Sequence, residues 1–318
     1  MAQATLDDAI TLIDAGRTDE GVNLLREVAS KGEPQALFVL ADLTWSGTLV
    51  GQDPPRGRLL FEYSAALGHP QANIIATNLL GNGIAGRRDW PAALERLGAE
   101  ARQLPERRAA LELLKAMTLD INGDPNGSLE AKLISERPYV RMFEALLTPA
   151  ECAYLIKVAE PLFEPSMVYD KLGIGVRDTI RTSDGAAFQW LIEDPAIHAL
   201  NRRVANATGT RFLQGEALQV LRYSPGQEYR PHFDYLEGSD NPRPWTALIY
   251  LNEDYEGGET AFVRTDFQVR GRTGDVLVFR NDGPDGKREP LAEHAGRPVT
   301  RGVKYLATRW IRERRWIP

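Results

Sequence analysis

The chain has 318 residues, of which 43% are hydrophobic and 26% charged, and its formal net charge is -6. This length allows two domains with buried cores, and the composition is ordinary for a soluble globular protein. The acidic balance gives no reason to expect a nucleic-acid partner. No apolar run approaches the roughly 20 residues that cross a bilayer, so a membrane partner is not expected either.

Cysteine usage and the N-terminus bear on the compartment. The chain has a single cysteine, Cys152, so no intrachain disulfide can form. The first residues lack the basic and apolar regions of a secretory signal. A protein without disulfides fits a reducing compartment, and we therefore expect a cytoplasmic protein.

The first third of the chain repeats with a period of 36 residues. The matching positions are Gly32–Ala36 and Gly68–Ala72, Gly47 and Gly83, and Asp53 and Asp89. Helix-like stretches lie between them, at residues 35–45, 56–67 and 71–80. This pattern is typical of stacked helix–turn–helix units, each of which buries its apolar face only against its neighbours. We expect two to three such repeats over residues 1–105.

The repeat pattern resembles Sel1-like repeats, a branch of the tetratricopeptide superfamily. It is clearest between Ala36 and Gly68, where an Ala-rich helix is followed by Gly, Asp-Pro and a second helix ending in Ala-Ala-Leu-Gly. The resemblance implies a concave surface on which a peptide or protein docks. A helical cap that only keeps the rest of the chain soluble is the alternative.

Residues 106–135 form a predicted linker. Residues 106–119 read as one more amphipathic helix, and the turn-rich sequence at 122–127 (Asn-Gly-Asp-Pro-Asn-Gly) follows it. The second domain is expected over residues 136–318.

The second domain has the pattern of short strands with a few helices. Thr148, Pro149 and Glu151 predict a helix start with a capping box. The stretches expected to form strands are 139–147, 217–223, 246–251, 260–264, 275–279 and 303–310. Even spacing of short strands predicts an α+β fold in which a double-stranded β-helix, or jelly roll, is supported by helices and preceded by the helical repeats.

The segment 223–234 carries the strongest functional pattern, because it ends in His232-Phe233-Asp234. On an extended strand, side chains i and i+2 leave the same face, so this imidazole and carboxylate can bind one metal ion. His294 is the candidate third ligand. Two histidines and one carboxylate on one face are the arrangement expected of non-haem iron(II) oxygenases. The alternative is that both histidines are ordinary polar core residues.

Residues 136–318 resemble the prolyl 4-hydroxylase-type iron(II)- and 2-oxoglutarate-dependent dioxygenases. The matching segments are Arg181–Ser183, Leu218–Asp234, Leu248–Asn252, Gly257–Phe262, His294–Val299, Gly302–Lys304 and Trp310. The resemblance implies that His232, Asp234 and His294 hold the iron. It also implies dioxygen as a cosubstrate, and it leaves room for ascorbate as a further cofactor.

The resemblance assigns the 2-oxoglutarate pocket as well. Lys304, ten residues after His294, corresponds to the cationic anchor for the distal carboxylate of 2-oxoglutarate. On a strand at 303–310 it shares a face with Trp310, and a buried lysine needs an anionic partner; a solvated lysine on the outer face is the alternative. The further cofactor-binding candidates are Tyr223, Tyr229, Tyr250 and Thr260, with Tyr223 and Tyr250 preferred over Tyr229 and Thr260 the weaker candidate. Plain packing inside the barrel is the alternative for each tyrosine.

Two residues are candidates for the catalytic end of the pocket, Arg181 and Trp310. The resemblance places Arg181 on a segment that folds over a peptide substrate and Trp310 near that substrate. A surface salt bridge and simple core packing are the respective alternatives. Arg312 stands where collagen-type members often have histidine, which argues against a collagen-like substrate. The basic tail 309–315 either favours an acidic substrate surface or is a solvated edge.

The function implied is hydroxylation of a prolyl residue at C4 in a peptide or protein, with 2-oxoglutarate converted to succinate and carbon dioxide. The same chemistry on another residue or a small molecule is the first alternative. A repeat-based binding module with an inactive barrel is the second. A zinc hydrolase is disfavoured because no general base stands beside the three ligands in a recognisable motif.

Overall fold

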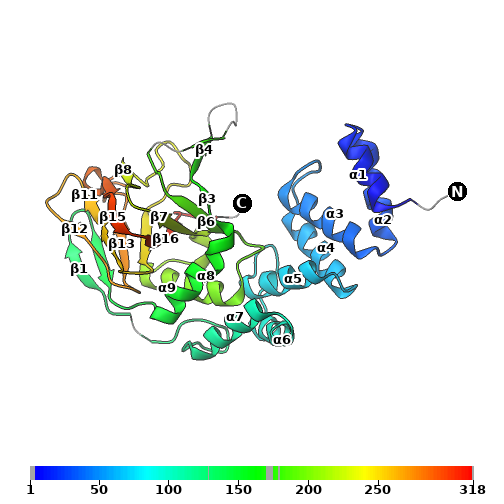
Figure 1. Cartoon of the computed structure of the whole chain (residues 1–318), viewed down its shortest axis with the longest axis horizontal. Coiled ribbons are helices and arrows are strands. Elements are labelled where there is room, and N and C mark those ends of the chain that lie inside the picture. The colour runs from blue at the N-terminus through cyan, green and yellow to red at the C-terminus, as the bar shows by residue number, and fades with distance from the viewer. Residues whose placement is uncertain (1–3, 128, 170–174, 178–179, 317–318) are drawn as a thin grey trace. The chain divides into compact units, whose positions relative to one another are not determined.

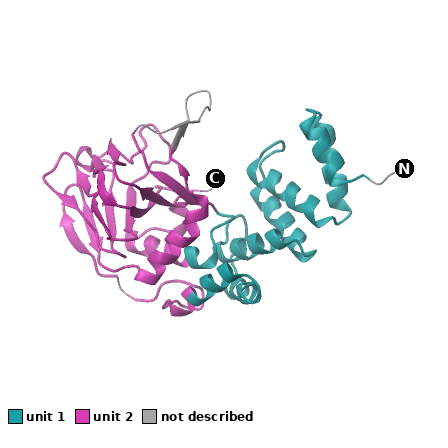
Figure 2. Cartoon of the chain, in the orientation of Figure 1, with its two compact units in different colours: residues 1–112, 190–198 teal, residues 113–189, 199–318 magenta. Residues whose placement is uncertain are grey.

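The computed structural model describes residues 4–127, 129–169, 175–177 and 180–316. The chain divides into two compact units, shown in Figure 2: unit 1 holds Met1–Glu112 and Trp190–His198, and unit 2 holds Leu113–Gln189 and Ala199–Pro318. The first division falls inside a helix. The domain limits expected at residues 105 and 135 therefore stay predictions.

Unit 1 consists mainly of paired helices (Figure 1). They are α1 (Leu6–Asp14), α2 (Thr18–Ser30), α3 (Pro34–Ser46), α4 (Pro54–Ala66), α5 (Pro70–Asn82) and α6 (Trp90–Glu100). A further helix, α7 (Pro105–Ala116), crosses the end of the unit. Helices α3 and α5 begin at residues 34 and 70, and α4 and α6 at 54 and 90, so both pairs repeat after 36 residues. The predicted helical repeats are confirmed.

The repeated residues begin and end the helices. Asp53 and Asp89 are the N-caps of α4 and α6, and each carboxylate accepts a hydrogen bond from a backbone N–H three residues later. Gly47 and Gly83 end α3 and α5 with φ of 78° and 71°. A left-handed residue at this place is what a glycine cap provides.

Unit 1 also contains a segment that lies far away in the sequence, Trp190–His198. Asn82 Nδ2 donates to the carbonyl of Trp190 at 2.9 Å, and Asn78 Nδ2 donates to that of Leu191 at 2.9 Å. His198 is fully buried, and its Nδ1 lies 2.8 Å from Glu193 Oε1. Two asparagines of helix α5 thus hold a segment that is not part of the repeats.

Unit 2 is built on antiparallel sheets. In the described part of the chain the large sheet has eight strands, in the order β1 (Lys132–Ser135), β2 (Val140–Phe143), β13 (Val276–Arg280), β9 (Trp245–Tyr250), β16 (Lys304–Ile311), β7 (Leu218–Tyr223), β6 (Asp184–Phe188) and β3 (Glu164–Pro165). The small sheet runs β12 (Gln268–Val269), β11 (Thr260–Phe262), β14 (His294–Gly296) and β8 (Tyr229–His232). Two strand pairs complete the unit, β10 (Tyr255–Gly257) with β15 (Val299–Gly302) and β4 (Met167–Tyr169) with β5 (Gly175–Arg177).

The core of unit 2 lies between the two sheets. Phe262 of the small sheet packs with Phe279, Leu277, Leu248 and Leu306 of the large sheet in one buried cluster. Burial of such side chains on both inner faces is what stabilises a sandwich of sheets. The arrangement is the jelly roll expected from the sequence.

Helices support this sandwich. They are α8 (Pro149–Ala159), α9 (Pro195–Thr208), which crosses the unit limit, and the short helices η1 (Glu160–Leu162), η2 (Phe212–Gln214) and η3 (Pro290–Ala292). The predicted capping box of α8 is confirmed: Thr148 Oγ1 accepts from the N–H of Glu151, and Glu151 Oε2 accepts from that of Thr148. No helix in the described part of the chain is long and apolar enough to span a bilayer.

Candidate metal centre and active site

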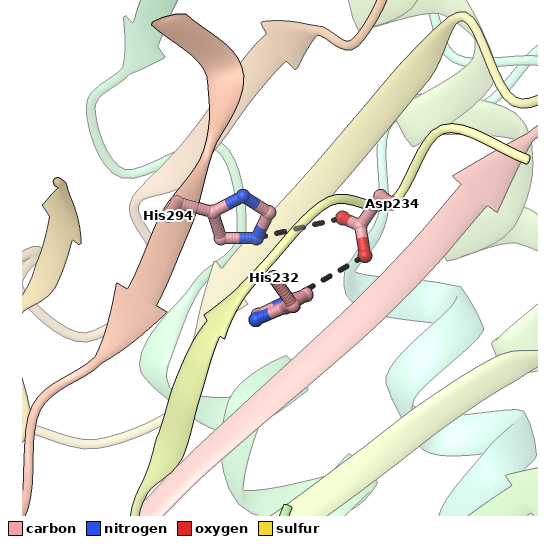
Figure 3. Close-up of side chains that lie close together, drawn as sticks. All are labelled: His232, Asp234 and His294. Carbon is pink, nitrogen blue, oxygen red and sulfur yellow. Dashed lines mark ion pairs between the residues drawn. The ribbon is translucent and has the colours of Figure 1, made fainter. Parts of the chain in front are cut away.

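Three side chains of unit 2 meet in one place. His232, Asp234 and His294 each offer a ligand atom, and these atoms lie within 4.8 Å of one another. His232 Nε2 is 3.6 Å from Asp234 Oδ1, and His294 Nε2 is 3.6 Å from Asp234 Oδ2. Figure 3 shows both imidazoles beside the carboxylate, with dashed lines marking the two nitrogen–oxygen pairs. The sequence-predicted ligands are therefore brought together.

Strand register places the two histidines side by side. His232 is the last residue of β8, His294 is the first residue of β14, and the two are direct partners in the antiparallel pair. Asp234 follows the end of β8. The prediction that His232 and Asp234 project from one strand is therefore wrong in detail. The chain leaves the strand after His232, and Asp234 reaches the same centre from the loop.

Both imidazoles are oriented by backbone carbonyls. His232 Nδ1 lies 2.8 Å from the carbonyl oxygen of Arg230, and His294 Nδ1 lies 3.0 Å from that of Ala292. A carbonyl accepts only, so in each ring Nδ1 carries the hydrogen. Each Nε2 then carries a free lone pair on the side of Asp234. This tautomer is the one that a metal ligand needs.

The protonation states suit a metal as well. Burial, together with the neighbouring His294 ring, lowers the pKa of His232 to about 3, although Asp234 opposes the shift. Burial alone would raise the pKa of Asp234, but the two imidazoles and a hydrogen bond from Thr246 lower it overall. Neutral imidazole and ionised carboxylate are the forms that bind metal. This donor set fits a divalent first-row metal such as iron(II).

Lys304 lies buried in the same region. Its side chain is on β16, the residue is 2% exposed, and Nζ donates to the carbonyl of Gly258 at 2.7 Å. Nζ is 5.5 Å from the ring centroid of Tyr223 and 5.8 Å from that of Tyr250. Burial lowers the pKa of Lys304 to about 8, and Glu259 partly offsets this. A buried ammonium is costly unless an anion pairs with it.

One pocket joins the metal-binding residues to Lys304. It contains about 410 Å³ of space between protein atoms, its open mouth included. The predicted site residues in its wall are Tyr223, Tyr229, His232, Asp234, Thr260, His294, Lys304 and Trp310. Both sheets contribute, since the histidines and Thr260 come from the small sheet and Lys304 and Trp310 from the large one. The pocket thus has a metal-binding end and a cationic end.

Tyr250 has a different environment from the other predicted tyrosines. It is fully buried in the core cluster between the sheets, and its hydroxyl donates to Thr260 Oγ1 at 3.0 Å. Tyr223 and Tyr229, in contrast, are in the pocket wall. Tyr250 therefore supports Thr260 directly, and its predicted contact with the cosubstrate stays a prediction.

Arg181 reaches the site through Tyr229. The two residues form a backbone bridge, and the guanidinium carbon of Arg181 lies 5.6 Å from the Tyr229 ring centroid. Tyr229 in turn stacks on His232. Arg181 Nε is buried and makes no hydrogen bond among the described residues. An unpaired buried donor is costly in a folded protein, so this one favours a ligand that offers an acceptor.

Trp310 also presents a buried donor without a partner. Its Nε1 makes no hydrogen bond within the described part of the chain. Arg243 packs over the ring, 4.2 Å from its centroid, and binds Glu216 with Nε and Nη2 at 2.6 and 2.7 Å. Arg312 also donates to Glu216, at 2.5 Å, and is 8% exposed. Arg312 is therefore a buried, ion-paired residue. It is neither part of a surface for an acidic substrate nor part of a solvated edge, the two expectations for the basic tail.

Three residues of the site were not found from the sequence. Gly258 supplies the carbonyl that binds Lys304, Thr246 donates to Asp234 Oδ2 at 2.7 Å, and Asn281 Nδ2 donates to Thr246 Oγ1 at 2.9 Å. The Gly-Gly-Glu-Thr motif at 257–260 contained a signal for Gly258. Thr246 and Asn281 carry none, because only the strand register brings them to Asp234.

Comparisons with known proteins agree with this arrangement. The profile described as the 2OG-Fe(II) oxygenase superfamily matches residues 218–312. Prolyl 4-hydroxylase 1 of Arabidopsis thaliana is 34% identical over 208 residues, which cover 59% of this chain and 74% of the plant protein. Probable prolyl 4-hydroxylase 10 of the same plant is 33% identical over 222 residues, covering 61% and 76%.

Two solved structures resemble parts of the chain. A viral collagen prolyl hydroxylase from Paramecium bursaria Chlorella virus-1 is 27% identical, covers 54% of this chain and 95% of its own, and aligns with a TM-score of 0.41. A Sel1 repeat protein from Oxalobacter formigenes is 19% identical, with coverages of 35% and 49% and a TM-score of 0.30. The sequence relationship to the plant enzymes is sufficient by itself: the chain belongs to the 2OG-Fe(II) oxygenase superfamily, whose members use iron(II), 2-oxoglutarate and dioxygen, and it is a relative of the plant prolyl 4-hydroxylases.

Proposed function

We propose that this oxygenase hydroxylates C4 of a prolyl residue in a peptide or protein. The observation that carries the proposal is the single pocket in which the His232–Asp234–His294 triad and the buried Lys304 lie together. The substrate class is supported by the relatives, which are named as prolyl 4-hydroxylases or probable prolyl 4-hydroxylases.

The residues of the pocket have separable tasks. His232, Asp234 and His294 would hold the iron, and three protein ligands leave further positions open for cosubstrate and dioxygen. When bound, the iron would supply, with dioxygen as the oxidant, the oxidative decarboxylation of 2-oxoglutarate to succinate and carbon dioxide that drives hydroxylation. Lys304 binds the distal carboxylate of 2-oxoglutarate, because its buried ammonium gains an anionic partner there.

Two buried donors fit a peptide substrate. Arg181 Nε and Trp310 Nε1 both make no hydrogen bond within the described residues, and Trp310 is part of the pocket wall. A prolyl residue within a peptide has carbonyl oxygens on both sides, and proline itself has no N–H to offer. Donors in the enzyme therefore suit this substrate better than acceptors would. Arg181 and Trp310 bind the substrate carbonyls in the proposed complex.

The helical repeats are proposed to dock a protein substrate. Leu59, Tyr63 and Leu67 follow one another at four-residue spacing along α4 and its C-cap, and they are 56%, 64% and 49% exposed. Side chains at this spacing share one helix face. A helix that only caps the rest of the chain needs no large apolar side chains on its solvent face.

Point substitutions test the docking. Leu59→Ser with Tyr63→Ser is expected to raise KM for a protein substrate severalfold and to leave KM for a short prolyl peptide unchanged. The matched control is Ile10→Ser, because Ile10 is an apolar residue of α1 that is 39% exposed. Equal effects on protein and peptide would argue against docking on α4.

The chemistry is tested with purified protein, iron(II), 2-oxoglutarate and dioxygen on proline-containing peptides. We expect succinate formation and a peptide mass gain of one oxygen atom on proline. His232→Ala and Asp234→Ala should abolish both, while His69→Ala, in the repeats, should retain them. Succinate without any modified proline would reject the prolyl substrate but keep the oxygenase.

Two further points belong to this proposal. Ascorbate is proposed as an auxiliary reductant, and omitting it from the same assay should reduce the number of turnovers.

A cytoplasmic location is proposed because the chain can form no intrachain disulfide, and fractionation of cells expressing the protein tests it.

A further inference from the structure

Asp234 receives a hydrogen bond on one of its two carboxylate oxygens. Thr246 Oγ1 lies 2.7 Å from Oδ2, and Thr246 is fully buried on β9. Each oxygen also faces one imidazole, since Oδ1 is 3.6 Å from His232 Nε2 and Oδ2 is 3.6 Å from His294 Nε2. What distinguishes the two oxygens is the hydrogen bond from Thr246, which only Oδ2 accepts.

Asn281 fixes the direction of this bond. Its Nδ2 donates to Thr246 Oγ1 at 2.9 Å and to the carbonyl of Arg243 at 3.1 Å. The carbonyl of Arg243 accepts only, so the amide group must present its NH2 on this side. Because Thr246 Oγ1 already accepts a hydrogen from Asn281, its own hydrogen points to the carboxylate. Thr246 is thus the donor to Asp234 Oδ2.

The backbone in turn holds Asn281 in place. The residue directly follows β13 and is 1% exposed. Its N–H donates to the carbonyl of Pro244 at 2.9 Å, and its own carbonyl accepts from the N–H of Glu289 at 2.9 Å. Strand β13 pairs with β9, where Phe279 is the register partner of Thr246. The donor is therefore preorganised by the sheet.

We propose that Thr246, oriented by Asn281, is a positioning residue that limits Asp234 to one oxygen in binding the iron. The hydrogen bond engages Oδ2 and leaves the lone pairs of Oδ1 for the metal. A carboxylate that bound through both oxygens would occupy one more position of the ion. That position is needed for 2-oxoglutarate or dioxygen, since this class of site depends on open positions.

This role concerns the metal site alone and does not depend on the prolyl substrate proposed above. It can therefore be tested without substrate and without turnover. The probes are Mn(II) alone and then 2-oxoglutarate added to the Mn(II)-loaded protein, both in the absence of dioxygen, with affinities measured by calorimetry. Thr246→Val removes the hydroxyl at nearly constant volume, and Thr246→Ser keeps it.

We expect Thr246→Val to weaken 2-oxoglutarate binding to the loaded protein about 10-fold or more, which is the lower end of the losses seen when a group supporting a metal ligand is removed. The affinity for Mn(II) itself should fall less, because both carboxylate oxygens are then free to bind. Thr246→Ser should restore the wild-type 2-oxoglutarate affinity. A purely structural threonine would not give this split or this rescue.

A second variant keeps the test decisive if Thr246→Val unfolds. Asn281→Ala frees the Thr246 hydrogen to rotate, so it should weaken 2-oxoglutarate binding in the same direction but by less. Unchanged 2-oxoglutarate affinity in both variants, or loss of Mn(II) affinity alone, would overturn the positioning role. Wild-type protein that binds no Mn(II) would overturn the metal site as well, whereas binding without prolyl hydroxylation would reject only the proposed substrate.

Discussion

Tyr229 lies flat against His232, with ring centroids 3.4 Å apart and ring planes inclined by 13°. The contact covers one face of a proposed metal ligand, while the carbonyl of Arg230 fixes the edge of the same ring. His232 is the more exposed of the two histidines, with 11% of its side chain accessible against 5% for His294. The tyrosine therefore restrains the ligand that has more freedom to move.

Removal of this ring should loosen the metal. Tyr229→Ala is expected to lower the affinity for Mn(II) about 10-fold, as is typical when support of a metal ligand is lost. Tyr229→Phe keeps the stacking and should bind Mn(II) like the wild type. Calorimetric titration with Mn(II) measures both, and an unchanged affinity in Tyr229→Ala would show that the stack is dispensable.

A side chain at Gly258 is expected to press against Lys304. It has φ of 68°, and a Cβ there would lie 3.1 Å from Lys304 Cδ and 3.2 Å from Tyr255 Cε2. Gly258→Ala should therefore displace Lys304 and raise the KM for 2-oxoglutarate at least severalfold. Gly286→Ala is the matched control, since Gly286 has φ of 72° but a Cβ added there would meet nothing within 4 Å.

Both glycine variants place an alanine in a left-handed conformation and should lose about 1–2 kcal/mol of stability from that alone. The KM effect should appear only in Gly258→Ala. Steady-state kinetics in 2-oxoglutarate and thermal melting separate the two contributions, and equal KM values in both variants would contradict a role for Gly258.

The affinity for 2-oxoglutarate should depend on pH through Lys304. Burial lowers the pKa of this lysine to about 8 from its ordinary value of 10.5. Only the charged form pairs with a carboxylate, so affinity should be constant below about pH 8 and fall by up to about tenfold per pH unit above it. Titrations of Mn(II)-loaded protein across this pKa, starting about one pH unit below it, check the dependence. Lys304→Met should bind weakly and without this pH dependence.

The same shift has the opposite consequence for the free protein. Between about pH 8 and 10.5 the unfolded chain keeps a proton on Lys304 that the folded protein has lost. The contribution of Lys304 to the free energy of unfolding therefore rises with pH across this window, because the unfolded state binds more protons. Lys304→Met should remove that contribution from the pH dependence of denaturant unfolding.

Cys152 should be inert in the folded protein. It is fully buried on α8, and burial, with Glu151 nearby, raises its pKa to about 12. The thiolate is the reactive form. We expect no alkylation by iodoacetamide near neutral pH in native protein and complete alkylation in denaturant, as measured by intact mass. Labelling of the native protein would contradict the buried position.

Local features of the fold were well predicted from the sequence. The 36-residue period and the Thr148 capping box depend on residues close in the chain, so pattern alone identified them. The longer strands were found for the same reason. Strands β8 and β14 have only four and three residues, too few for a periodic pattern, although they carry both metal-binding histidines.

Long-range relations within the site were harder to predict. His294 was identified through resemblance, since nothing near it in the sequence points to His232. Thr246 and Asn281 reach Asp234 because β9 and β13 pair in one particular register. A shift of one residue would turn Thr246 to the other face of the sheet. The position of Asp234 beyond its strand depends on the loop conformation, which strand periodicity does not describe.

The segment Trp190–His198 has a consequence for how this protein can be dissected. Helix α5 supplies the donors to its carbonyls, yet in the chain the segment stands between β6 and the rest of the catalytic half. No single cut in the polypeptide separates the two units. Deleting the repeats would remove Asn82 and Asn78, which donate hydrogen bonds to the carbonyls of Trp190 and Leu191. A loss of activity in the shortened protein would therefore reflect disturbed structure around this segment as well as lost docking.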